Sequence, residues 1–142
     1  MEIDMPDVVA EVQGAFDRYE QALVSNDVET LDALFRDDPR TVRFGSTENL
    51  FGYDQIKAFR AARSPAGLAR TLANTVVTTY GRDFAIASTL FHRATMPGKV
   101  GRQTQTWVRF PEPPKSEISR APFTASASTR KPFTNVSVSG EK

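Results

Sequence analysis

Cysteine is absent from the sequence, and histidine occurs only once, as His92. Without cysteine, the chain cannot form a disulfide framework, a zinc knuckle or a catalytic thiol. A metal site built from several histidines is excluded as well, and a Ser-His-Asp triad would have to use His92. Glycine motifs that bind phosphates or dinucleotides are also missing. We therefore expect a protein that works without a metal ion or a cofactor.

A large excess of one charge and long hydrophobic runs are missing too. The 142 residues include 18 Lys and Arg against 17 Asp and Glu, whereas proteins that neutralise nucleic-acid phosphates carry a larger basic excess. Apolar runs are too short for a membrane helix, and the acidic N-terminus does not resemble a secretory signal. We therefore expect a globular cytoplasmic protein that binds neither nucleic acid nor a membrane.

The composition changes near Phe110. The last 32 residues hold five of the nine prolines but only two of the ten phenylalanines, and they are rich in Ser and Thr. Such a segment has too little apolar surface to form a packed core. We predict one domain over residues 1–112 and a poorly ordered Pro/Ser/Thr-rich tail over residues 113–142.

Apolar spacing predicts three helices and four strands in the domain. The first helix follows Asp4 as its cap, and its apolar residues recur at helical spacing from residue 8 to residue 23. The second runs from its cap Asp27 to Phe35, and the third covers residues 53–62. Strands are predicted over residues 41–44, 71–80, 84–93 and 100–110.

The last three predicted strands are separated only by short turns. Such turns connect antiparallel strands, because parallel strands need long crossovers. The order of elements, helix-helix-strand-helix-strand-strand-strand, therefore predicts an α+β fold with helices on one face of a curved antiparallel sheet.

Two side chains lie at positions where their chemistry is unusual. Tyr19 belongs to the apolar stripe of the first helix, either as a core residue or as a phenol that donates a proton into a pocket. Arg43 lies in the middle of the first strand. It faces either solvent or the interior, where it would need an anion such as a carboxylate.

The predicted strand over residues 100–110 has polar residues on both faces. One explanation is a sheet surface that contacts solvent or another subunit. The other is a pocket wall in which Arg102 or Gln105 donates hydrogen bonds. Trp107 of the same strand is expected in the core or in an interface.

Several segments together resemble one family. They are FDRYEQAL at 16–23, VRFG at 42–45, FGY at 51–53, YGRDFA at 80–85 and GRQTQTWVRFP at 101–111. Over residues 3 to 112 the chain resembles the AtzH-like family, which includes the oxalurate catabolism protein HpxZ. This family is part of the SnoaL-like, nuclear transport factor 2-like superfamily, so the resemblance implies a cone-shaped α+β fold.

The resemblance also implies an activity. AtzH-like enzymes include a decarboxylating amidohydrolase that converts 1,3-dicarboxyurea to allophanate, beside an amidase-signature hydrolase, in ureide, oxalurate or s-triazine breakdown. The essential tyrosine and arginine of that enzyme fall on Tyr19 and Arg43. The implied partners are a small anionic ureide-type substrate and a second copy of the chain in a homodimer. Further substrate contacts are expected from Arg102, Gln105, Phe44 and Phe59.

The chain departs from the family after Pro111, where family members continue directly into a final strand. Pro113 and Pro114 stand there instead, and proline cannot donate a hydrogen bond in a central strand. An altered C-terminus would explain this change, and without a replacement the edge of the strand over 100–110 would be exposed. Residues 134–139 alternate in polarity and are a candidate replacement.

Two other functions compete with the enzyme. One is a non-catalytic ligand-binding or accessory protein of an amidase pathway, because a fold is often kept when its chemistry is lost. The other is an isomerase or dehydratase that uses a buried carboxylate. The second is disfavoured because no acidic residue lies on the predicted inward faces.

Overall fold

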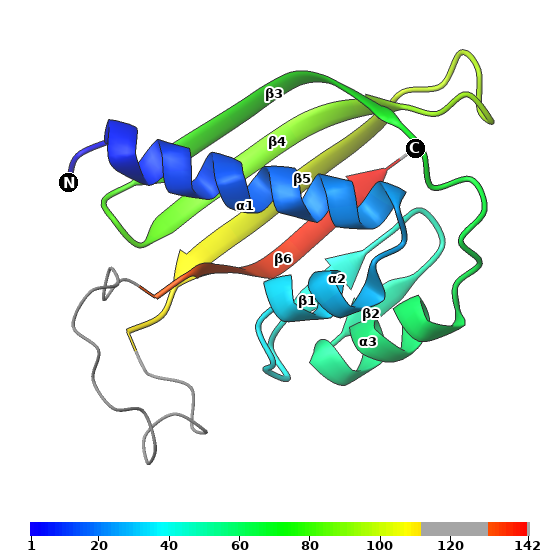
Figure 1. The fold of residues 1–142 in the computed structure, drawn as a ribbon, viewed down its shortest axis with the longest axis horizontal. Coiled ribbons are helices and arrows are strands. Elements are labelled where there is room, and N and C mark those ends of the chain that lie inside the picture. The colour runs from blue at the N-terminus through cyan, green and yellow to red at the C-terminus, as the bar shows by residue number, and fades with distance from the viewer. Residues whose placement is uncertain (112–130, 142) are drawn as a thin grey trace.

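A six-stranded sheet, covered on one face by helices, forms the part of the chain that the computed structural model describes, residues 1–111 and 131–141 (Figure 1). Its elements are α1 (Pro6–Val24), α2 (Val28–Leu34), β1 (Val42–Phe44), β2 (Asn49–Phe51), α3 (Tyr53–Ala62), β3 (Thr71–Tyr80), β4 (Phe84–His92), β5 (Gly101–Arg109) and β6 (Phe133–Glu141). In these described ranges, no helix is both long and apolar enough to cross a membrane.

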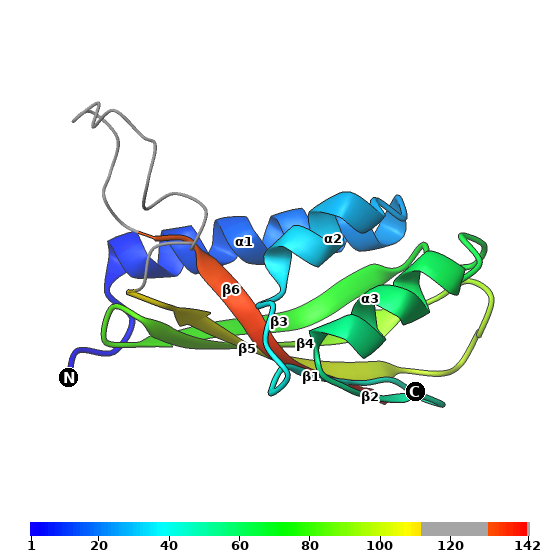
Figure 2. The same ribbon diagram turned by 90° about the horizontal axis from the view of Figure 1, so that it is seen from below.

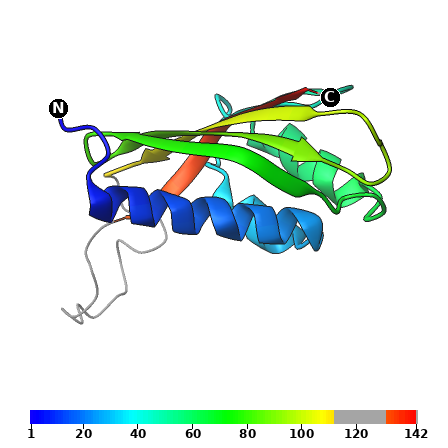
Figure 3. The same cartoon turned by 90° about the horizontal axis from the view of Figure 1, so that it is seen from above.

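The strands lie in the order β2-β1-β6-β5-β4-β3. Figures 2 and 3 show the helices together on one side of the sheet, and the sheet itself is curved. The predicted α+β class is therefore confirmed. Two details differ from the prediction: β2 was not predicted, and β1 runs parallel to β6. A parallel pair is possible here because the chain between β1 and β6 is long enough for a crossover.

The last strand comes from the segment that the sequence assigned to the tail. β6 pairs with β5 in antiparallel register, from Arg109 opposite Phe133 to Arg102 opposite Glu141. Phe133 and Val138 are buried, so the alternating segment contributes apolar side chains to the core. The edge of β5 is thus covered, and the predicted domain boundary at residue 112 does not hold for residues 133–141. The rest of the predicted tail, residues 113–130, lies outside the described residues.

Helix α1 packs its apolar stripe on the sheet. Asp4 was predicted to cap this helix, but the N-cap is Met5, which makes no side-chain cap hydrogen bond. Asp4 has a positive φ of 58° and instead accepts a hydrogen bond from the Thr79 amide at 3.0 Å. It therefore anchors the N-terminus to β3. Asp27 caps α2 as predicted, because its carboxylate accepts from the Thr30 amide at 3.2 Å.

The core between helices and sheet fixes the ring of Tyr19. This ring lies edge-on to Trp107, with centroids 6.4 Å apart, and 5.9 Å from the ring of Phe35. Trp107 is fully buried and donates its indole N–H to the side-chain oxygen of Gln105 at 2.9 Å. Aromatic packing of this kind holds a side chain in one position. Tyr19 is therefore held rigidly on the inner face of α1.

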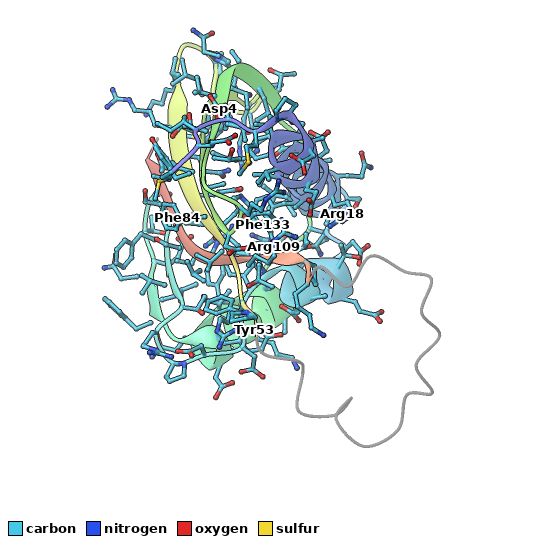
Figure 4. The ribbon with its side chains drawn as sticks, turned by 90° about the vertical axis from the view of Figure 1, so that its left-hand side faces the viewer. Asp4, Arg18, Tyr53, Phe84, Arg109 and Phe133 are labelled. Carbon is cyan, nitrogen blue, oxygen red and sulfur yellow. The ribbon has the colours of Figure 1, made fainter. Side chains whose placement is uncertain are left out.

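A buried arginine joins the far end of β5 to its neighbours. The guanidinium of Arg109 lies 4.3 Å from the ring centre of Phe133, and both residues are labelled in Figure 4. It donates to the Glu11 carboxylate at 2.7 Å and to the carbonyl oxygens of Lys131 and Arg82 at 2.8 and 3.1–3.2 Å. This arginine connects α1, β5 and the start of β6.

Candidate functional site

A cavity of about 220 Å³ lies between the C-terminal half of α1, the end of α3 and the inner face of the sheet. Its wall combines polar and aromatic side chains with the loop that follows β1. Its lining residues include Tyr19, Arg43, Phe44, Glu48, Phe59, Arg63, Arg70, Phe91, Arg93 and Gln103. Of the charged side chains in this wall, four are arginines and one is a glutamate, so the cavity has a positive potential that attracts anions.

Tyr19 is both a core residue and part of the cavity wall. Only 1% of its surface is exposed, and its ring packs on Phe35 and Trp107. No described residue forms a hydrogen bond with its hydroxyl group. A buried tyrosine normally pairs its hydroxyl with a partner. The hydroxyl of Tyr19 is therefore available to a ligand in the cavity.

Arg43 lines the same cavity from strand β1, rather than facing solvent. Its Nη1 donates to Glu48 Oε1 at 2.8 Å, and its guanidinium lies 5.4 Å from the ring centre of Phe59. Its Nε is buried and has no hydrogen-bond partner. The side chain therefore has a carboxylate on one edge and an unused donor on another.

Glu48 is placed against Arg43 by the loop that follows β1. The loop is a tight turn in which the Gly45 amide donates to the Glu48 carbonyl oxygen at 2.9 Å. The Glu48 carboxylate lies against Gly45, where a Cβ atom would collide with it. Burial by itself raises the pKa of Glu48, but hydrogen bonds from Arg43 and Thr47 outweigh this effect and hold the pKa below its ordinary value. Glu48 is thus ionised at neutral pH and occupies the side of Arg43 where another carboxylate could bind.

The remaining arginines of the cavity differ in their partners. Arg70 donates three hydrogen bonds to the Glu20 carboxylate, at 2.6, 2.9 and 3.2 Å, and one to Gln103 at 3.0 Å. Arg63 has a buried Nε and a buried Nη2 without partners. Arg93 donates a long hydrogen bond of 3.4 Å to the carbonyl of Gly67, and its buried Nε has no partner among the described residues.

Burial lowers the pKa of both Arg63 and Arg93, and repulsion from neighbouring arginines adds to the effect. Arginine nevertheless stays protonated in proteins. Among the described residues, neither of these two cations has a carboxylate at ion-pair distance, and Glu20 acts on Arg93 only from farther away.

Arg60 supports the cavity from behind. It is 1% exposed, its guanidinium lies 4.1 Å from the ring centre of Phe35, and Nη1 is 3.5 Å from Asp32 Oδ1. Burial lowers the pKa of Arg60, and its charge also interacts with Tyr19. Arg60 thus ties α3 to α2 and adds positive potential close to Tyr19.

The structure brings together four of the six residues that the sequence and the resemblance singled out: Tyr19, Arg43, Phe44 and Phe59. Arg102 and Gln105 do not line this cavity. Gln105 is fully buried against Trp107, and Arg102 is exposed on the other face of β5. Successive strand residues point to opposite faces, so Arg102 and Gln105 could not both face one pocket. The residue of β5 that reaches the cavity is Gln103.

Several cavity residues were not predicted from the sequence. One signal was present: Arg60 and Arg63 follow Ile56 at spacings of four and seven, which places them on the buried stripe of α3. Arg70 precedes β3 and Arg93 follows β4, where no periodicity marks a side chain as inward. His92 is exposed at the end of β4. Across the described ranges, no cluster of three or more His, Asp or Glu side chains is arranged to hold a metal ion.

Comparison with known proteins gives a family and a fold. A sequence model of the AtzH-like family matches residues 1–120. No curated protein matches the chain.

Among solved structures, a protein of unknown function of the DUF3225 family from Pectobacterium atrosepticum is 45% identical with a TM-score of 0.82; the match covers 98% of this chain and 93% of that one. A cystatin-like fold protein from Burkholderia xenovorans is 40% identical with a TM-score of 0.82, and the match covers 99% of this chain and 95% of that one. An NTF2-like protein of unknown function from Pseudomonas putida, at 16% identity and a TM-score of 0.69 over 96% and 87%, is similar in fold alone.

Proposed function

The chain belongs to the AtzH-like family, and we propose that it is a decarboxylating amidohydrolase for small N-carboxylated ureas, converting 1,3-dicarboxyurea to allophanate and carbon dioxide. One observation carries this proposal. Tyr19 and Arg43, which correspond to the essential tyrosine and arginine of the resembled enzyme, line one arginine-rich cavity. Its positive potential suits an anionic substrate.

Binding begins at Arg43. Its planar guanidinium matches the two oxygens of a carboxylate, and such a pair fixes both position and orientation. Glu48 now holds one edge of this guanidinium at 2.8 Å. A substrate carboxylate takes over that edge, and the unpartnered Nε gains an acceptor. The substrate is thereby oriented before the reaction, which lowers the entropic part of the barrier.

The reaction itself needs one proton. The bond between the carboxylate carbon and the ureide nitrogen breaks, its electron pair stays on the nitrogen, and the carboxylate leaves as carbon dioxide. Tyr19 donates its hydroxyl proton to that nitrogen as general acid and later regains a proton from water. N-carboxylated ureas are already labile, so no covalent nucleophile is required.

The sequence predicted no carboxylate in the pocket, but the structure places the carboxylate of Glu48 in the cavity wall. This does not favour an isomerase or dehydratase, because Glu48 is paired with Arg43 and its pKa is lowered. A general base near neutral pH would need a raised pKa. The remaining alternative is a binding protein or accessory protein that exchanges Glu48 for a ligand carboxylate without turnover.

A turnover assay distinguishes the proposed enzyme from a binding or accessory protein. Purified full-length protein is mixed with dicarboxyurea that an amidase generates, and release of carbon dioxide is followed. We expect Tyr19→Phe to keep the fold and lose activity. Tyr80→Phe is the matched control, because Tyr80 does not line the cavity. Parental activity in the Tyr19 variant would refute the proton-donor role, and no acceleration by the parent protein would favour the binding protein.

A further inference from the structure

Arg63 and Arg93 have no role in the chemistry described above. We propose that these two side chains form a second anion subsite, so that the cavity selects ligands with two negative groups over ligands with one. This inference rests on the proposed function only in taking the same cavity as the substrate site. It replaces Arg102 and Gln105, which were expected to hold the second carboxylate and do not reach the cavity.

The pairing of the four arginines carries the argument. Arg43 has Glu48 as its counter-ion at 2.8 Å, and Arg70 has Glu20 at 2.6 Å. Within the described ranges, neither Arg63 nor Arg93 has a carboxylate at ion-pair distance. Both have buried N–H groups that make no hydrogen bond. Buried donors without partners are costly, so their retention in a cavity wall indicates an acceptor that arrives with a ligand.

The surroundings of Arg63 strengthen this argument. The charged groups that act on it are Arg43, Arg60 and Arg93, all of the same sign, besides the phenol of Tyr19. For Arg93 they are Arg70 and Arg43, with Glu20 as the opposing charge. An anion placed between Arg63 and Arg93 removes this repulsion and satisfies the free donors together.

Two aromatic rings hold the cations in place, with two arginines beside each ring. The guanidiniums of Arg43 and Arg63 lie 5.4 and 5.9 Å from the ring centre of Phe59. Those of Arg70 and Arg93 lie 4.5 and 5.2 Å from the ring centre of Phe91. A cation over an aromatic face is held by the ring's quadrupole. The cavity therefore presents positive groups at separate fixed points, which suits a short ligand with an anion at each end.

The test uses binding rather than turnover. Glutarate has three atoms between its carboxyl carbons, as 1,3-dicarboxyurea does, but cannot undergo the reaction. Monomethyl glutarate has almost the same length and carries only one charge. By isothermal titration calorimetry, we expect glutarate to bind the parent protein about tenfold more tightly or better, because one further charge-assisted contact is worth about that factor.

Variants of the cavity arginines test whether Arg63 and Arg93 cause the preference for glutarate. Arg63→Gln/Arg93→Gln is expected to remove the preference for glutarate and to change the affinity for the monoester less than about twofold. Arg43→Gln is expected to weaken both ligands. Arg82→Gln is the control, because Arg82 is half exposed and pairs with Asp7 outside the cavity. If the double variant does not fold, the ratio of the two affinities in the single variants decides.

Three results would overturn the inference: no binding of glutarate to the parent, equal binding of the two ligands, or a preference unchanged in the folded variants. None of them depends on catalysis. If the protein prefers glutarate through Arg63 and Arg93 but releases no carbon dioxide, the subsite is supported and the proposed enzymatic activity is refuted. If the protein decarboxylates its substrate but does not prefer glutarate over the monoester, the enzymatic activity is supported and the subsite is refuted.

Discussion

Arginines are buried at both ends of the inner face of β5, and the two groups differ in how completely they are paired. At one end, Arg109 has two carboxylates, Glu11 and Asp83, and two carbonyl acceptors, and its guanidinium lies over the ring of Phe133. At the cavity end, Arg43 has an unused Nε, and Arg63 and Arg93 have buried donors without partners. Burial alone thus does not tell a structural arginine from a binding one. The state of the donors separates Arg109 from these three arginines of the cavity wall, because folding usually pairs the donors that it buries.

The largest expected effect concerns the binding end. If the protein is the proposed enzyme, Arg43→Gln removes the charge that orients the substrate carboxylate, so we expect decarboxylation to fall by about a hundredfold or more while the protein stays folded. Carbon dioxide release measures the first effect and thermal unfolding the second. A variant that unfolds readily but, while folded, turns over normally would make Arg43 a structural residue like Arg109.

The opposite result is expected at the structural end. Arg109→Gln removes the ion pairs with Glu11 and Asp83 and the hydrogen bonds to the carbonyls of Arg82 and Lys131. We expect the free energy of unfolding to fall by about 3 kcal/mol, the range for breaking a buried pair. Urea denaturation measures this loss. The folded fraction should keep its affinity for glutarate, and a selective loss of affinity with unchanged stability would contradict the distinction.

A smaller effect of opposite sign is expected for Arg63. Its charge is partly buried and lies among like charges, so Arg63→Gln should raise the free energy of unfolding by about 1 kcal/mol in the absence of ligand. The same urea titrations measure it, with Arg82→Gln as the surface control. Destabilisation comparable to that of the Arg109 variant would show that Arg63 already has the partners it needs.

The smallest effect is a dependence on pH. The pKa of Glu48 is below its ordinary value of 4.5 in the folded protein. Its contribution to stability is therefore present above the unfolded pKa and is lost as the pH falls through the folded pKa. At pH 7 we expect Glu48→Gln to be less stable than the parent by about 1 kcal/mol. The gap should close in acid, and a gap that stays constant from pH 7 to about pH 3 would exclude this origin.

Local patterns explain why much of the fold was predictable. The helices and the three strands β3, β4 and β5 follow from apolar spacing and short turns, and all appear with nearly the predicted bounds. β2 has only three residues, too few for a periodicity. Its partner β1 also pairs with β6, from a distant part of the chain. Such a long-range pairing depends on how the whole sheet closes, which no local pattern reports.

The residues of the site also differ in whether a local sequence pattern could identify them. Tyr19 and Arg43 were singled out because a polar group is unusual at an inward position. The sequence left open whether Arg43 faces solvent or the interior, and the structure places it in the cavity wall. Arg102 and Gln105, expected to contact the substrate, do not line the cavity, because side chains alternate along β5 and the residue of this strand that reaches the cavity is Gln103. Arg63, Arg70 and Arg93 come from the end of a helix, a loop and the end of a strand.

By itself, the sequence determined the class of fold and the core stripe of α1, and it singled out Tyr19 and Arg43 as candidates for chemistry. These properties depend on neighbours three or four positions apart in a helix, or two apart in a strand. The tertiary structure alone decided that Phe133–Glu141 completes the sheet and that four arginines meet in one cavity. Convergence of charges from four separate elements is a property of packing, because only packing brings them close enough to repel one another and to need an anion.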